Sequence, residues 1–159
     1  MKEEWFSTTL LQWGECGKLF YQGDRVLAYA QYSPALYLPR TMYFRTSPPS
    51  ADAVFLSCLF VVPEVRGGGL GGVLLRAIER DLYKRKFKAI ETLASKFPGE
   101  KPPGPIEFYL RNGFYILRDD EEFPLLRLDF KSLVFWQENL EAALESLKVP
   151  AKADIPVPS

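Results

Sequence analysis

A run of glycines in the middle of the chain has the composition of a phosphate-binding turn. Residues 67–72 are GGGLGG, so five of the six are glycine. Glycines let the main chain turn its N–H groups inward without a side-chain clash, and a helix that begins there adds the positive end of its dipole. The apolar segment 54–62 leads into this turn, and an amphipathic helix is predicted over 69–86 after it. The pattern predicts a nest of amides whose natural ligand carries a pyrophosphate.

Spacing excludes one common phosphate loop. The P-loop of nucleotide hydrolases has lysine and then serine or threonine after its last glycine, because these side chains contact the phosphates and the magnesium ion. In this chain Val73 and Leu74 follow Gly72. Nucleotide hydrolysis is therefore excluded as the chemistry of this turn.

A dinucleotide loop fits the glycines but not their surroundings. Gly67, Gly69 and Gly72 match G-x-G-x-x-G, and Glu91 follows 19 positions later, near the place of a ribose-binding acid. However, residues 63–66 separate the apolar strand from the first glycine, whereas a dinucleotide loop follows its strand directly. The segment before the strand has the pattern of an antiparallel hairpin, not of a second βα unit. An NAD(P)-dependent oxidoreductase is therefore the weaker alternative.

A third kind of loop, with an arginine three residues ahead of a G-x-G, fits both the spacing and the context. The chain resembles the GNAT superfamily of acetyl-CoA-dependent N-acyltransferases, whose strand, V-x-P-x-x-R-G-x-G-x-G loop and helix match Val61, Pro63, Arg66, Gly67, Gly69 and Gly71. A second segment, FYLRNGF at 108–114, is similar to the superfamily's F-Y-x-x-x-G-F element. The two motifs together are specific in order and separation. The resemblance extends over roughly residues 17–130.

The resemblance implies a fold and an activity. The fold would be mixed α/β, with a central, mostly antiparallel sheet, a βαβ cofactor-binding unit and flanking helices. The activity would be acetyl-CoA-dependent N-acetyl transfer to a small-molecule or peptide amine, by direct attack in a ternary complex and without a metal. The alternative on the same fold is a catalytically silent acyl-CoA sensor or interaction module.

The resemblance also assigns contacts to coenzyme A. The main chain at Leu59, Phe60 and Val61 would bind the pantetheine in the manner of an added strand. The pyrophosphate would be held by Arg66, Gly67, Gly68, Gly69, Leu70, Gly71 and Gly72. Many GNAT proteins have an asparagine seven residues ahead of the motif tyrosine, where this chain has Pro102. One pantetheine contact of the family pattern is therefore in doubt.

Catalytic groups follow from the same comparison. Tyr109 matches the tyrosine that protonates the leaving thiolate, and a phenol of pKa near 10 is close enough to a thiol near 8.5 for this transfer. Glu91, on the second predicted parallel strand, is the candidate base, while a relay through Ser57 and Cys58 or water alone are alternatives. The acidic run 119–122 would attract a cationic amine if it faces the acceptor, or would simply form a solvated turn.

The composition of the chain bears on the remaining classes of function. Twenty basic and 20 acidic residues cancel, so nothing favours a nucleic-acid partner. The chain has no histidine, which removes the usual general base, the Ser-His and Cys-His nucleophiles and the commonest metal ligand. Cys16 and Cys58 are too isolated to predict a zinc site or a disulfide framework. No apolar stretch reaches the length of a membrane span, so a cytoplasmic protein is expected, with a homodimer left open.

One domain over residues 1–150 is expected, followed by a mobile tail at 151–159. GNAT proteins usually carry a strand and two helices ahead of the first hairpin, and here the length allows about one helix. Either the sequence is trimmed at this end or this member lacks part of the wall of the acceptor pocket.

The predicted elements are a helix at 2–12, a hairpin at 17–21 and 25–32, a loop at 33–53, strands at 54–62 and 89–94 around the helix at 69–86, a short helix between Pro105 and Gly113, strands at 114–117 and 125–130, and a helix at 133–147.

Overall fold

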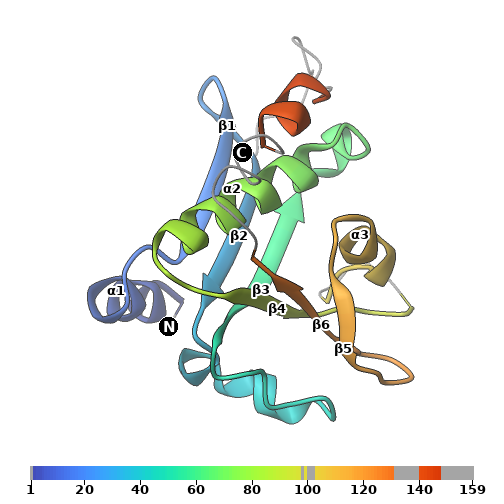
Figure 1. Ribbon diagram of the computed structural model, residues 1–159. Coiled ribbons are helices and arrows are strands. Elements are labelled where there is room, and N and C mark those ends of the chain that lie inside the picture. Colours follow the sequence, from blue (N-terminus) through green and yellow to red (C-terminus); the bar gives the residue numbers. More distant parts are fainter. Residues whose placement is uncertain (1, 98, 100–102, 131–139, 148–159) are drawn as a thin grey trace.

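Six strands form one sheet in the computed structural model, which describes residues 2–97, 99, 103–130 and 140–147 (Figure 1). The strand order is β1-β2-β3-β4-β6-β5, and β3 and β4 form the parallel pair in an otherwise antiparallel sheet. This confirms the predicted mixed α/β fold with a mostly antiparallel sheet. The strands are β1 (Gly17–Gln22), β2 (Arg25–Ser33), β3 (Ala53–Val61), β4 (Ala89–Leu93), β5 (Tyr115–Arg118) and β6 (Leu125–Asp129).

Three whole helices and three short 3₁₀ turns also lie in the described part of the chain. They are α1 (Lys2–Gln12), α2 (Leu70–Lys84), α3 (Ile106–Arg111), η1 (Ala35–Tyr37), η2 (Pro39–Tyr43) and η3 (Pro63–Val65). Predicted and observed ends of the strands and of α1 and α2 agree to within two residues. Of the helix predicted at 133–147, the structure describes residues 140–147, which are helical over 140–145. The predicted tail lies outside the described residues.

Helix α2 covers one face of the sheet. Its sequence repeats apolar residues at helical spacing, so a single stripe faces inward. In Figure 1 the helix lies across the front of β2 and β3. The fully buried side chains Leu70, Ile78 and Leu82 meet Leu56 and Ile90 from the strands in one core cluster. Burying each such side chain stabilises the fold by about 1.5–3 kcal/mol, which sets the position of α2 against β3.

The opposite face is covered over only part of its width. The proline-rich segment 33–53 folds over β3, β4 and β6 and forms a second, smaller core there. That core consists of Phe55, Leu93 and Leu125 with Ala35, Leu38, Phe44 and Leu117 around them. The segment is therefore an ordered cover for the lower part of the sheet, as predicted for a loop rich in prolines and aromatics.

A buried ion pair joins α2 to the end of α3. Arg76 Nη1 is 2.6 Å from Glu79 Oε2, and Arg76 Nη2 donates to the Asn112 carbonyl at 2.8 Å. Glu79 is fully buried, and this burial raises its pKa to about 7, although Arg76 partly offsets the effect. The guanidinium thus holds together two helices that carry separate sequence motifs.

We predict that Arg76→Met destabilises the fold strongly, because it leaves the Glu79 carboxylate buried without a partner. The expected loss is about 3–5 kcal/mol in the free energy of unfolding, measured by urea titration. The double variant Arg76→Met/Glu79→Leu removes both charges and should recover most of that loss. A double variant as unstable as the single one would show that the guanidinium's contact with α3, and not charge compensation, dominates.

Candidate active site

Strands β3 and β4 run together for a short distance and then diverge. They pair at Ala53 with Ala89, Val54 with Ile90 and Phe55 with Glu91, after which β3 continues to Val61 without β4 beside it. Beyond this point the residues that follow β4 hydrogen-bond to residues 104–106 instead of to β3. Ser95 N donates to the Gly104 carbonyl at 2.8 Å, and Ile106 N donates to the Ser95 carbonyl at 3.0 Å. A gap therefore opens along the second half of β3.

The main chain of β3 turns alternate groups toward this gap. Val62 N donates to the Leu27 carbonyl of β2 at 2.9 Å, so alternation along the strand directs the N–H and C=O groups of Leu59 and Val61 to the other edge. Phe60 is paired in register with Tyr29, so its main chain faces β2. Of the three residues predicted to bind pantetheine, two present main-chain groups to the gap and Phe60 does not.

Tyr109 closes the narrow end of the gap. The Thr92 hydroxyl donates to the Leu56 carbonyl at 2.8 Å, bridging the strands just after their last pair. Tyr109 on α3 is 4% exposed, and its hydroxyl contacts Thr92. Burial raises the pKa of Tyr109 to about 12, and the Thr92 contact partly offsets the rise. The phenol is therefore protonated at neutral pH and held beside the point of divergence.

Neighbouring aromatic rings fix the orientation of Tyr109. Its ring lies 5.1 Å from the Phe108 ring and 5.3 Å from the Phe114 ring, both in edge-to-face geometry. Such pairs are worth about 0.5–1.5 kcal/mol beyond the area that they bury. Ring packing therefore adds to the Thr92 contact in fixing the position of the Tyr109 hydroxyl.

The glycine turn has the conformation that the sequence predicted. Gly67 and Gly69 have φ of 86° and 92°, values that other residues rarely adopt. Gly69 is the N-cap of α2, and no side chain of the described residues caps the helix. A Cβ built on Gly67 would meet no described atom within 4 Å. The first amides of α2 and the space over the turn therefore suit the pyrophosphate of coenzyme A.

Two other glycines of the motif serve packing. A Cβ on Gly71 would lie 2.9 Å from Phe108 Cε1, and one on Gly72 would lie 3.2 Å from Asn112 Oδ1. These glycines let α3 approach α2 closely, so they place Tyr109. On the far side, Leu147 Cδ1 is 4.0 Å from a Cβ built on Gly69, so segment 140–147 borders the turn (Figure 1).

Arg66 folds back onto β3. Its Nε donates to the Val61 carbonyl at 2.8 Å, and its Cζ lies 5.4 Å from the centroid of the Phe60 ring. The guanidinium thus spans the end of the strand beside the glycine turn. Its contact uses one of the main-chain carbonyls that face the gap.

Glu91 forms a buried structural ion pair. Its side chain is fully buried, Oε2 accepts from Arg127 Nη1 at 2.7 Å, and Oε1 accepts from Ser50 N at 2.8 Å. Both carboxylate oxygens are therefore engaged, and Arg127 also pairs with Asp52 and Asp129. To act as a base, Glu91 would have to give up a buried charge pair, which costs several kcal/mol. This geometry favours a structural role for Glu91.

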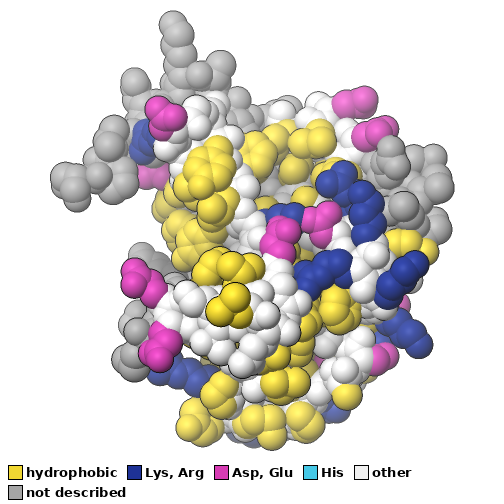
Figure 2. All heavy atoms as spheres, turned by 90° about the vertical axis from the view of Figure 1, so that its left-hand side faces the viewer, with side chains coloured by type: hydrophobic (Ala, Val, Ile, Leu, Met, Phe, Trp, Pro, Cys, Tyr) yellow, Lys and Arg dark blue, Asp and Glu magenta, His cyan; other side chains and the backbone are white. Residues whose placement is uncertain are grey.

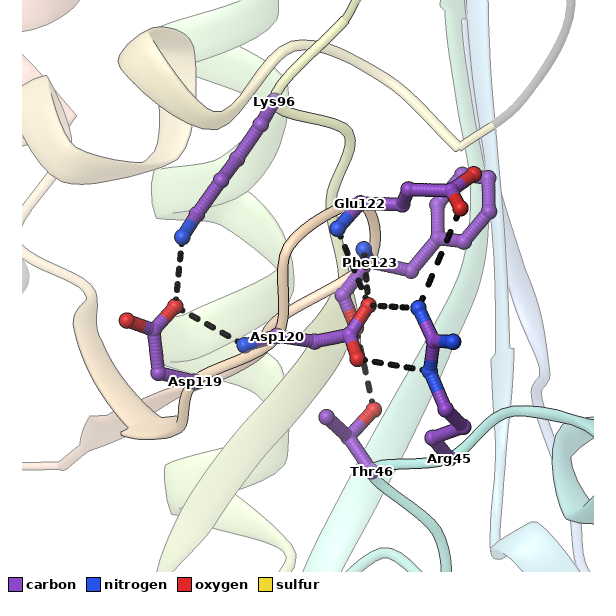
Figure 3. Close-up of polar contacts among 7 residues, drawn as sticks. All are labelled: Arg45, Thr46, Lys96, Asp119, Asp120, Glu122 and Phe123. Carbon is purple, nitrogen blue, oxygen red and sulfur yellow. Dashed lines mark hydrogen bonds and ion pairs between the residues drawn. The ribbon is translucent and has the colours of Figure 1, made fainter.

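The acidic run 119–122 is largely neutralised (Figure 3). Lys96 Nζ lies 2.7 Å from Asp119 Oδ1, and Arg45 donates to both carboxylate oxygens of Asp120, at 2.9 and 3.3 Å. Asp120 Oδ2 also accepts from the amides of Glu122 and Phe123, and these contacts hold its pKa below the ordinary value. The run pins the β5–β6 turn to segment 33–53. This favours the alternative of a structural turn over a rim that attracts cations.

Two residues of this site were not predicted from the sequence. Thr92 was one, because an isolated threonine in a strand carries no signal until the neighbouring strand is known. The other was Tyr29 on β2, which lies close enough to Cys58 on β3 for the thiol, after burial, to raise the pKa of the phenol. Only the register of β2 against β3 brings these two side chains together. In the described part of the chain, no cluster of three or more histidine, cysteine or acidic side chains could hold a metal, and no helix is long and apolar enough to cross a membrane.

Comparison with known proteins agrees with this geometry. The sequence model of the Acetyltransferase (GNAT) family matches residues 2–114, which is more than half of the chain. The chain belongs to the GNAT acetyltransferase family. A search of curated proteins found no match.

Solved structures of other GNAT-like enzymes share the fold. PaiA N-acetyltransferase from Thermoplasma acidophilum, in complex with coenzyme A, is 13% identical with a TM-score of 0.54, over 80% of this chain and 77% of its own. Ribosomal-protein-alanine N-acetyltransferase from Brucella melitensis is 17% identical with a TM-score of 0.57, over 81% and 76%. Naa20 from Chaetomium thermophilum, in complex with a bisubstrate analogue, is 15% identical with a TM-score of 0.57, over 83% and 75%. At these identities the likeness establishes the GNAT fold.

We predict that Gly71→Ala lowers stability, because the new methyl group would overlap the Phe108 ring and push α3 away from α2. The expected cost is about 1–3 kcal/mol in the free energy of unfolding. Gly68→Ala is the matched control, since it adds the same methyl group in the same turn at a residue without a left-handed backbone. Equal and small effects of both substitutions on the melting temperature would contradict the packing role of Gly71.

Proposed function

We propose that this GNAT protein is an acetyl-CoA-dependent N-acetyltransferase that transfers the acetyl group directly to an amine. The carrying observation is the gap between β3 and β4. Along one side it has main-chain groups of β3 that β4 does not pair, at one end a glycine turn that no described side chain caps, and at the other end a protonated Tyr109. A binding module would need the first two features but not a phenol at the end of the gap.

The described residues fit coenzyme A. The glycine turn and the first amides of α2 would hold the pyrophosphate, and the groups of Leu59 and Val61 that face the gap would pair with the pantetheine amides. When bound, coenzyme A supplies an acetyl group activated as a thioester. The neighbour that was solved with coenzyme A supports this assignment through its shared fold.

Tyr109 acts as the acid. Its hydroxyl stays protonated throughout the physiological pH range and can give this proton to the leaving sulfur as the C–S bond breaks and the N–C bond forms. Thr92, Phe108 and Phe114 position the group before reaction, which saves the cost of ordering it in the transition state.

Water is the best acceptor for the proton of the amine. Glu91 is held by Arg127 and Ser50, and the chain contains no histidine. Attack by a neutral amine then needs no protein base, and its proton leaves to solvent after the N–C bond has formed. Cys58 lies on β3 with Tyr29 as its partner, and nothing in that pair activates it for a covalent acetyl-enzyme route.

A dinucleotide-binding function finds less support. The acid that would bind the ribose is Glu91, and its two oxygens are used inside the sheet. The hairpin before β3 is antiparallel, as the sequence indicated, so no second βα unit precedes the turn. The engaged Glu91 carboxylate and the antiparallel hairpin therefore both argue against a dinucleotide-binding fold.

The ligand preference can be tested by thermal melting. Acetyl-CoA at about a hundredfold above its dissociation constant should stabilise the fold by about 2.7 kcal/mol, and NADH at the same concentration should not. For a chain of this size that corresponds to a rise of roughly 5–10 °C in the melting temperature. Equal shifts with the two ligands would overturn the assignment of the turn.

Tyr109→Phe separates an acetyltransferase from a silent sensor. The change removes only a hydroxyl, so the ring packing and the affinity for acetyl-CoA should survive. Turnover with an accepted amine should fall by about a hundredfold or more, in kcat and kcat/KM together, because the lost contact belongs to the transition state.

The pH profile gives a second check on Tyr109. With its pKa near 12, the phenol keeps its proton, so kcat should not decline between pH 8 and about 10.5 on account of this group. Turnover of the Phe variant at the parental rate would show that Tyr109 is a core aromatic. A descending limb near pH 9 that disappears in the variant would contradict the raised pKa.

A further inference from the structure

The face of the sheet opposite α2 is uncovered over β1, β2 and the end of β3. Leu59 and Val61 pack toward α2, so Phe60 between them points to the other face. There Leu19 on β1 is in register with Tyr29 on β2, and Tyr29 with Phe60 on β3. We call these three side chains, the two aromatic residues Tyr29 and Phe60 and the neighbouring Leu19, the aromatic row.

The row is accessible and flat. The rings of Tyr29 and Phe60 lie 5.4 Å apart at 32°, while Leu19 is 55% exposed and Phe60 36%. Figure 2 views the molecule from the side of α1 and β1 and shows hydrophobic side chains gathered on it. Tyr21, at 56% exposure, extends this apolar surface toward the turn of the hairpin. Helix α1 covers only the beginning of β1, where Phe6 lies beside Gly17.

The row leads directly to the reacting end of the gap. Cys58 lies two residues before Phe60 on the same face of β3, about 7 Å along the strand. Its thiol lies close enough to Tyr29 and Tyr109 to raise the pKa of each phenol, although burial has the larger effect. On the α2 face the gap is closed by Tyr109 and Ile106, which are 4% and 7% exposed. An acceptor must therefore reach the gap from the side of the row.

The charges on this side of the sheet disfavour a polycation as the acceptor. The guanidinium of Arg66 lies over Phe60 and places a positive charge at the end of the row. The carboxylates that could have attracted an amine are already paired: Glu91 with Arg127, Asp119 with Lys96 and Asp120 with Arg45. An aromatic ring, by contrast, finds two rings that it can stack against or meet edge-on.

We propose that the aromatic row binds the acceptor and selects amines that carry a flat aromatic ring. The inference rests on the proposed function, because it names the acceptor class of the same site. Phe60 and Tyr29 would set specificity, and neither takes part in the proton transfers.

The test compares three amines as acceptors: 2-phenylethylamine, n-butylamine and spermidine. Release of free coenzyme A thiol from acetyl-CoA gives kcat/KM for each. We expect 2-phenylethylamine to be preferred over n-butylamine by at least tenfold, and over spermidine by more. Phe60→Ser should reduce that preference about tenfold, mainly through KM, whereas Phe60→Tyr should keep it. Leu11→Ser is the control, since it removes an 87% exposed leucine from α1, away from the row.

The outcomes distinguish the proposed selection of aromatic amines from the proposed N-acetyltransferase activity. Turnover without preference for the aromatic amine, or a preference that Phe60→Ser leaves unchanged, overturns the selection by the row and leaves the N-acetyltransferase in place. Preferred turnover of spermidine or of a hydrophilic peptide amine overturns it as well. If no amine reacts, calorimetry with 2-phenylethylamine decides. Binding that Phe60→Ser weakens supports the row as a ligand surface while the proposed activity fails, and no binding overturns both.

Discussion

The short pairing of β3 with β4 is the constraint on which the site depends. Three residue pairs hold the two strands together before the β4 chain takes residues 104–106 as its new neighbour. This exchange of partners leaves the main chain of β3 open along one edge, and it brings α3 with Tyr109 to the place where the strands part. Thr92 bridges that point through the Leu56 carbonyl, so the end of the gap is fixed by a single hydroxyl.

Most charges in this molecule maintain that geometry and do not act in catalysis. Arg76 with Glu79 ties α2 to α3, and Arg127 gathers Glu91, Asp52 and Asp129 around β4 and β6. The Arg45–Asp120 pair does the same for the turn between β5 and β6 (Figure 3). Buried or partly buried ion pairs of this kind are costly to break. They therefore hold the elements in place, and their carboxylates are poor proton acceptors. In the proposed mechanism the proton transfers fall to an uncharged phenol, Tyr109, and to water.

The face of the sheet opposite α2 is covered unevenly by the described residues. One helix, α1, and the folded segment 33–53 cover the lower part of the sheet, and the upper part stays apolar and open. The open part contains Tyr29 and Phe60 and borders the gap at Cys58. This open surface is the one that we propose binds the acceptor.

The sequence by itself determined the elements and the motifs. Alternating and helical apolar patterns predicted the strands and α2, and glycine spacing with Arg66 predicted the turn, because these signals are local. It could not determine the partners of single side chains. Glu91 is an ion-pair member and not a free base, Gly71 makes room for the Phe108 ring, and Phe60 turns its main chain to β2. Strand register and helix approach decide these contacts, and they join residues that are far apart in the chain.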